Sequence, residues 1–206
     1  MGKILEISGA ENFKNIRALV LTAILIAFAV IGYGLLRIEP IQGVRVSFGF
    51  VFLATIAFLF GPAIAFPAGI IASMLAAVIF STGGAGFNPL FDLNRGISGI
   101  LYGSFLYGRN PKSEYFIIWV VAAKATVNFI CNIIINTYLL MLIGWIHTDA
   151  ANIITVIRIF RNVVFLPVEI IILFTVLKFV AVYAQRYKFT APSKILTKRS
   201  LPHKYK

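Results

Sequence analysis

Long apolar runs separated by charged residues, glycine and proline are the feature that most constrains this chain. They cover 16–36, 46–60, 63–80, 93–107, 115–143 and 153–183. A helix needs roughly 20 apolar residues to cross a bilayer, and these runs approach or exceed that length. With 60% of its 206 residues hydrophobic and 13% charged, the chain has too little polar surface for a water-soluble domain. We therefore predict an all-α integral membrane protein with about six transmembrane helices.

Basic residues predict how the chain is oriented, because the cytoplasmic flanks of transmembrane helices collect Lys and Arg. The amino-terminal segment, the turn with Arg109 and Lys112, and the carboxyl end hold thirteen of the 19 basic residues. Six helices place these three regions on one side, so we expect both termini in the cytoplasm. Residues 1–15 would form an amino-terminal cytoplasmic segment, 16–183 the membrane domain and 184–206 a basic cytoplasmic tail. The apolar run after residue 15 has no signal-peptide cleavage pattern.

The sequence contains no pattern typical of an enzyme or a metal protein. One Cys excludes a disulfide framework, and two His without a spaced Cys or carboxylate cluster argue against a zinc site. The glycine-rich stretch 83–86 lacks the following Lys and Ser/Thr of a nucleotide-binding loop. We therefore expect a protein that is not an enzyme, carries no cofactor and does not itself hydrolyse ATP.

A stripe of polar residues runs along the fifth apolar segment. Lys124, Asn128, Asn132 and Asn136 follow one another at four-residue steps, which places them on one helix face. A charge and three amides facing lipid would be costly, so this face must point inward. It could hold the bundle together by interhelical hydrogen bonds. Alternatively, it could bind a heterocycle with amide-like edges.

A second group of charges lies toward the expected outer face. Arg158 and Arg161 are three residues apart on the last helix, and Arg45 lies near the first outer loop. Guanidinium groups pair well with carboxylates, so this cluster would favour an anionic ligand. Internal salt bridges are the alternative, and Glu169, which follows Pro167, is most simply an internal ion-pair partner.

Aromatic and small residues add further candidates. Phe48 and Phe87, near the outer loops, could stack on a flat ring, and we include the adjoining Asn88 as a candidate binding residue. Ala23 and Ala27 lie four residues apart in the first helix, a spacing that allows close approach of helix backbones in lipid. The pair could serve packing within the chain or a surface for another membrane protein.

Several stretches together resemble the substrate-binding S components of energy-coupling factor (ECF) vitamin transporters, in particular the folate family. The stretches are Arg45-Val46-Ser47-Phe48-Gly49-Phe50, Phe60-Gly61-Pro62, 83–89, 97–103, 124–137 and 158–169. The resemblance covers about residues 16 to 182 and implies a six-helix, high-affinity vitamin-binding protein in the plasma membrane of a prokaryote. Pyridoxine and hydroxymethylpyrimidine S components are similar in pattern and are alternatives, as is a membrane scaffold that transports nothing.

The resemblance also implies partners and a place for the ligand. An S component docks on a shared transmembrane coupling subunit with two ATPase subunits, and Ala23 and Ala27 match the family's docking motif on the first helix. The first outer loop would act as a lid. Folate would then place its pterin against Lys124, Asn128 and Asn132, and its carboxylates nearer the arginine cluster.

Overall fold

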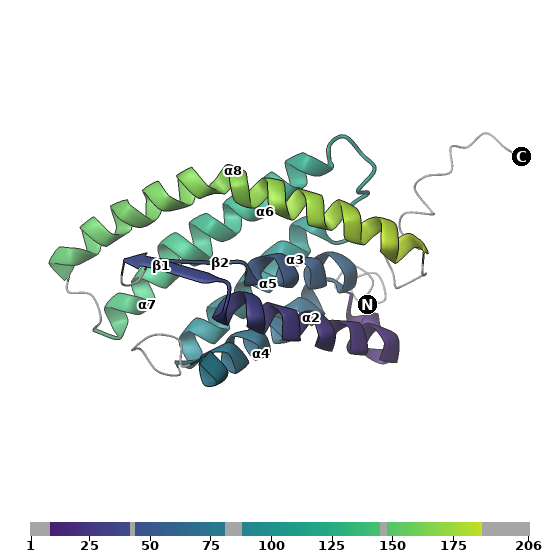
Figure 1. The fold of residues 1–206 in the computed structure, drawn as a ribbon, viewed down its shortest axis with the longest axis horizontal. Coiled ribbons are helices and arrows are strands. Elements are labelled where there is room, and N and C mark those ends of the chain that lie inside the picture. The colour runs from purple at the N-terminus through teal and green to yellow at the C-terminus, as the bar shows by residue number, and fades with distance from the viewer. Residues whose placement is uncertain (1–8, 42–43, 81–87, 145–147, 187–206) are drawn as a thin grey trace, which may run out of the picture.

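The computed structural model describes residues 9–41, 44–80, 88–144 and 148–186, and Figure 1 shows their arrangement as an elongated helical bundle. The elements are η1 (Ala10–Lys14), α2 (Ile16–Gly34), β1 (Arg37–Ile41), β2 (Val44–Ser47), α3 (Gly49–Phe60), α4 (Pro62–Phe80), α5 (Pro89–Leu106), α6 (Phe116–Val127), η2 (Asn128–Ile135), α7 (Asn136–Leu142) and α8 (Thr148–Arg186). Elements α6, η2 and α7 follow one another without a break and form one helical span.

The prediction of about six helices is confirmed for the part of the chain that the structure describes. Each expected apolar run corresponds to one helix or, for 115–143, to the continuous span of α6, η2 and α7. Two glycines with positive φ, Gly61 and Gly108, lie where α3 and α5 end, and the left-handed conformation there favours glycine. The expected basic tail after residue 186 lies outside the described residues.

One element was missing from the all-helical expectation. The first outer loop forms an antiparallel β-hairpin, in which Arg37 pairs with Ser47 and Ile38 pairs with Val46. The alternation of β-branched and polar residues in Arg37–Ile41 and Val44–Ser47 is typical of a strand. We read only the long apolar runs, and this short alternation lies between two of them.

The helices divide into those that can meet lipid and those that the bundle surrounds. Among the described residues, four helical segments are long and apolar enough to cross a membrane: 16–34, 62–80, 116–142 and 159–184. Helix α3 has 12 residues and all but Phe52 are buried, so it lies inside the bundle. Helix α5 turns Asp92, Asn94 and Ser98 inward, which keeps these polar groups away from the membrane.

The two ends of the bundle differ. The start of α2 and the end of α8 lie at one end in Figure 1, and the hairpin and the start of α8 lie toward the other. At the first end, η1 contacts the last residue of α3. The side-chain amide of Asn12 donates a hydrogen bond to the backbone carbonyl of Phe60 at 3.1 Å. The polar residues described below lie toward the hairpin end.

Helices α4 and α5 pack backbone against backbone through glycine. A Cβ atom on Gly69 would lie 2.6 Å from the backbone carbonyl oxygen of Arg95, and one on Gly103 would lie 2.6 Å from Cα of Pro62. Gly99 meets the carbonyl of Ala65 in the same way. Gly99 and Gly103, four residues apart on α5, therefore serve close packing here. This contact fixes the rotation of α5 and hence the direction of its polar face.

We predict that Gly69→Val destabilises the protein by about 1–3 kcal/mol, because the backbone of α5 must move away from the new side chain. The free energy of unfolding can be measured by titration with sodium dodecyl sulfate in mixed micelles. Val78→Ile, on the exposed face of the same helix, is the control and should have little effect. Equal stability of Gly69→Val and the control would contradict the tight α4–α5 contact.

Candidate functional site

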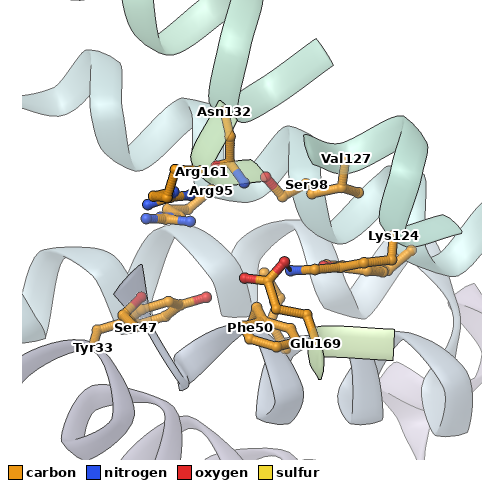
Figure 2. A pocket seen from close by; sticks show the side chains of 12 residues that line it. Tyr33, Ser47, Phe50, Arg95, Ser98, Lys124, Val127, Asn132, Arg161 and Glu169 are labelled. Atoms are coloured by element: carbon orange, nitrogen blue, oxygen red, sulfur yellow. Dashed lines mark ion pairs between the residues drawn. The ribbon is translucent and has the colours of Figure 1, made fainter. Parts of the chain in front are cut away.

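A polar pocket lies inside the bundle toward the hairpin end, and six parts of the fold contribute to it (Figure 2). These are α2, β2, α3, α5, the span of α6 and η2, and α8. The lining residues are Tyr33, Ser47, Phe50, Leu53, Arg95, Ser98, Tyr102, Lys124, Val127, Asn132, Arg161 and Glu169. A cluster of charges, hydroxyls and an amide at this position in an apolar chain is typical of a ligand site.

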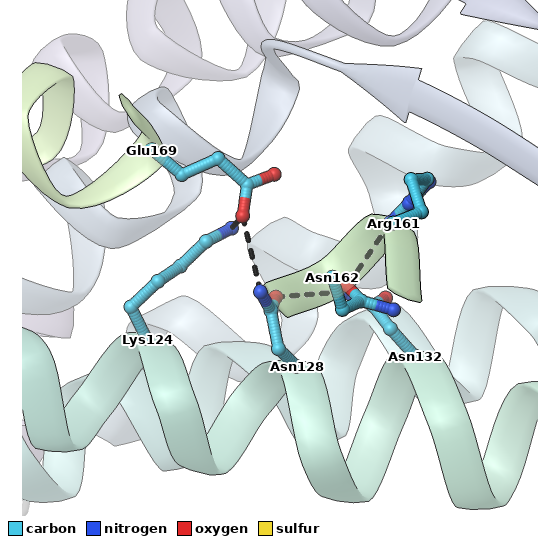
Figure 3. Close-up of polar contacts among 6 residues, drawn as sticks. All are labelled: Lys124, Asn128, Asn132, Arg161, Asn162 and Glu169. Atoms are coloured by element: carbon cyan, nitrogen blue, oxygen red, sulfur yellow. Dashed lines mark hydrogen bonds and ion pairs between the residues drawn. The ribbon is translucent and has the colours of Figure 1, made fainter. Parts of the chain in front are cut away.

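Lys124 and Glu169 form a buried ion pair at one side of the pocket. The Nζ atom of Lys124 lies 3.2 Å from Oε2 of Glu169, and both side chains are largely buried. Asn128 donates a hydrogen bond to the same carboxylate oxygen at 3.0 Å, and Asn132 donates to Oδ1 of Asn128 at 2.9 Å (Figure 3). A carboxylate and an ammonium buried in a membrane need such compensation, because isolated charges are costly there. The amide stripe therefore joins two helices through Glu169.

The ammonium group of Lys124 has a second neighbour. Its Nζ atom lies 3.4 Å from the centre of the Phe50 ring on α3, a cation–π contact. Phe50 on one side and Glu169 on the other hold the lysine in place. Figure 2 shows the second carboxylate oxygen of Glu169, Oε1, pointing away from Lys124. The arrangement thus presents a fixed hydrogen-bond acceptor to the pocket.

A π-helical stretch shapes the amide face. In an α-helix, four-residue steps drift by about 40° around the axis. Residues Asn128–Ile135 form a π-helix, and a π-turn holds more residues than an α-turn, which counters that drift. Asn128 and Asn132 therefore stay in line with Lys124. Asn136 opens α7, is half-buried and is not among the residues that line the pocket.

Two arginines lie on another side of the pocket. Arg95 comes from α5 and Arg161 from α8, and Figure 2 shows them on the same side of the site. Their like charges act on each other, and Glu169 attracts Arg161. Arg161 also donates a hydrogen bond to Oδ1 of Asn162 at 3.1 Å (Figure 3). The pocket wall carries three cations, Arg95, Lys124 and Arg161, against one carboxylate, Glu169. That excess of positive charge favours an anionic ligand.

The remaining predicted residues lie elsewhere or can be placed only by their backbone. The side chain of Asn88 caps α5 by accepting a hydrogen bond from the backbone N–H of Leu90 at 3.0 Å. Phe48 precedes α3 and is 36% exposed. Arg45 belongs to β2 and Arg158 to α8, and the structure does not describe their side chains. Phe87 lies outside the described residues.

Sequence reasoning counted Arg95 among the charges away from the cytoplasmic flanks, but missed that a face of α5 lines the pocket. Arg95, Ser98 and Tyr102 line the pocket, and their spacing of three and four residues places them on one helix face. This spacing was available in the sequence but was less conspicuous than the amide stripe. Tyr33, which we did not expect either, is one aromatic residue in an apolar helix and gave no such signal. Glu169 has the ion-pair partner that its position suggested.

The described residues contain no group of three or more His, Cys, Asp or Glu side chains that could hold a metal ion. Cys131 is buried, and its backbone carbonyl accepts a hydrogen bond from the side chain of Asn94 at 3.0 Å. The residues that line the pocket offer hydrogen bonding and charge pairing to a ligand.

Comparison with known proteins gives consistent results. A protein-family model described as "ECF-type riboflavin transporter, S component" matches residues 13–184. The folate transporter FolT of Clostridium novyi (strain NT) is 24% identical over 168 residues, which are 81% of this chain and 91% of that protein. A crystal structure of FolT bound with folic acid is 26% identical and has a TM-score of 0.66, with 86% of this chain and 96% of that chain covered.

We predict that Glu169→Gln lowers the free energy of unfolding by about 3–5 kcal/mol, because Lys124 is left as an unpaired buried charge. The double variant Lys124→Met/Glu169→Gln should recover a large part of this loss, since neither charge then remains. The four proteins of this double-mutant cycle can be compared by detergent titration. Lys112→Met, at an exposed position, is the control. Additive losses in the double variant would argue against direct coupling.

Proposed function

This chain belongs to the family of ECF-type transporter S components, and we propose that it binds folate. An S component is the substrate-binding part of a transporter, so the chain is not an enzyme, as expected from its sequence. The expected six-helix S-component fold and multi-pass membrane location in a prokaryote are likewise confirmed by the family and by the structural match. The matched family is named after riboflavin, so the substrate of this chain has to be inferred from the residues that line its pocket.

The positive charge of the pocket wall is the observation that favours folate. Riboflavin has no carboxylate, whereas folate carries the two carboxylates of its glutamate moiety. Lys124 pairs with Glu169, and Arg95 and Arg161 also line the wall, on the same side of the site in Figure 2. Guanidinium groups form strong, charge-assisted hydrogen bonds with carboxylates. Similarity to two folate proteins, one of them bound with folic acid, supports the same choice.

The polar groups suggest how folate would lie. Its glutamate carboxylates would meet Arg95 and Arg161, which leaves the pterin for the side of Glu169. The N3–H and 2-amino groups of a pterin are adjacent donors, and a carboxylate is their natural acceptor. In this pose Lys124 and Asn128 act by holding Glu169 in place, rather than by contacting the pterin directly. Asn132, which lines the pocket, remains a candidate for direct contact.

Other vitamins fit the charge less well. Pyridoxine and hydroxymethylpyrimidine are small and carry no carboxylate, so neither would engage both arginines. A scaffold that transports nothing could use the Lys124–Glu169 pair for stability alone. It would have no use for two further cations in the same pocket.

As an S component the chain works with an ECF module, and we propose that the docking surface is the exposed face of α2. Ala23 and Ala27 are exposed on α2, whereas Ala29 and Val30 on the same helix are buried against α4. The pair is therefore available to another membrane helix. We propose a module of one transmembrane coupling subunit and two ATPase subunits that hydrolyse ATP. Both termini would face the cytoplasm, and the pocket end of the bundle the outside.

We predict that the purified protein binds folate saturably, measured by isothermal titration calorimetry in detergent. Arg161→Gln and Arg95→Gln should each weaken binding by about tenfold or more, because each removes a charge-assisted contact. Lys112→Gln, at an exposed site away from the pocket, should bind as tightly as the native protein. Titrations with riboflavin, pyridoxine and hydroxymethylpyrimidine complete the set. Saturable binding of one of these without folate binding would overturn the substrate but leave the family intact.

We also predict that Ala23→Trp abolishes folate uptake and leaves folate binding unchanged, because the bulky ring blocks close approach of a partner helix. Uptake is measured in cells that also express the ECF module, and binding is measured on the purified variant. Thr175→Trp, on the exposed surface of α8, adds the same ring elsewhere and should retain uptake. Normal uptake by Ala23→Trp would count against α2 as the docking helix.

A further inference from the structure

Two tyrosine hydroxyls in the pocket wall have no hydrogen-bond partner within the described part of the chain. They belong to Tyr33 on α2 and Tyr102 on α5, and both oxygen atoms are buried. The whole side chain of Tyr102 is 0% exposed and that of Tyr33 is 8% exposed. A buried tyrosine hydroxyl usually has a partner, because leaving it unpaired costs about 1–3 kcal/mol. These two hydroxyls therefore require an explanation.

The rings are held in place, so the hydroxyls cannot simply turn toward another partner. Arg95 lies over the ring of Tyr33, with its guanidinium carbon 5.0 Å from the ring centre. The ring also packs against Gly49, where any added Cβ would overlap it. Tyr102 lies in the main core between helices, among Phe58, Ile64 and Leu106. Packing thus fixes both rings, and both residues line the pocket.

The hydroxyl of Tyr33 lies on the side of the pocket that holds the acceptor. Figure 2 shows the hydroxyl of Tyr33 pointing toward the carboxylate of Glu169. No hydrogen bond joins the two, because the oxygen of Tyr33 lacks any partner in the described residues. Tyr102 lies seven residues, about two helical turns, after Arg95 on the same face of α5. The pocket wall therefore combines one paired carboxylate with two tyrosines whose rings are held by packing.

We propose that Tyr33 and Tyr102 are ligand-binding residues whose hydroxyls, together with the carboxylate of Glu169, recognise the donor and acceptor edge of the pterin ring. This inference rests on the proposed function. The carboxylate accepts from the pterin N3–H and 2-amino groups. A hydroxyl can donate to the 4-oxo oxygen, which the carboxylate cannot do. The three groups thus match an edge on which donors stand beside an acceptor.

The glutamate end of folate is a poor partner for these hydroxyls. Its carboxylates would be repelled by Glu169, which lies on the same side of the pocket. Arg95 and Arg161 offer them charge-assisted bonds instead. The tyrosines therefore bind the pterin ring and the arginines bind the glutamate. A ligand that has only one of these two parts can separate the two roles.

The test compares Tyr33→Phe and Tyr102→Phe with the native protein, using folate and pteroate, which lacks the glutamate. We expect each variant to bind folate about tenfold more weakly, and pteroate more weakly by the same factor, by calorimetry in detergent. The thermal unfolding midpoint without ligand should stay equal or rise, because the change removes an unpaired buried hydroxyl. Tyr115→Phe, at an exposed position at the start of α6, is the control and should change neither measurement.

Each of the other outcomes would contradict the tyrosine contacts, the pterin contact or the proposed function. Native-like folate binding by both variants would refute the tyrosine contacts and leave the proposed function standing. Weaker binding of folate with unchanged binding of pteroate would place the hydroxyls at the glutamate, which overturns the pterin contact. Failure of the native protein to bind folate would refute the proposed function and the pterin contact together. The midpoints separate loss of binding from loss of folding, and two independent positions keep the test decisive.

Discussion

The buried ion pair between Lys124 and Glu169 is the interaction on which the rest of the pocket depends. A membrane interior offers no water to either charge, so each must find its partner inside the protein. The pair joins α6 to α8, and Asn128 and Asn132 extend it along the π-helical stretch. Phe50 brings α3 against the same lysine. One electrostatic requirement thus positions three helices around the ligand site.

The packing of α4 on α5 provides the second constraint. Glycine at positions 69, 99 and 103 lets the two backbones touch, which fixes how α5 is rotated. That rotation turns Arg95, Ser98 and Tyr102 toward the pocket. An S component that binds an amphipathic vitamin needs both features. A paired carboxylate gives a rigid acceptor for a heterocycle, and arginines on another side suit an anionic tail.

Much of the architecture could be predicted from the sequence, because membrane insertion depends on local composition. The length of each apolar run defines a helix, and the four-residue spacing of Lys124 and its asparagines shows which face must avoid lipid. The hairpin at Arg37–Ile41 and Val44–Ser47 escaped notice because its alternation is short. Asn88 was expected near the ligand, yet its side chain caps a helix. An asparagine can cap a helix or contact a ligand, and the sequence does not distinguish these two roles.

The sequence by itself determined the membrane class, the approximate number of helices, the inward direction of the amide stripe and the family resemblance. The tertiary structure alone decided that Lys124 pairs with Glu169, that Arg95 and Arg161 line the same pocket, and that Tyr33 and Tyr102 join its wall. The physical reason is the relative rotation of helices. Asn128 and Glu169 meet although they lie 41 residues apart. This contact depends on how two helices that are apolar on most faces pack against each other. The local periodicity of the sequence does not specify that packing.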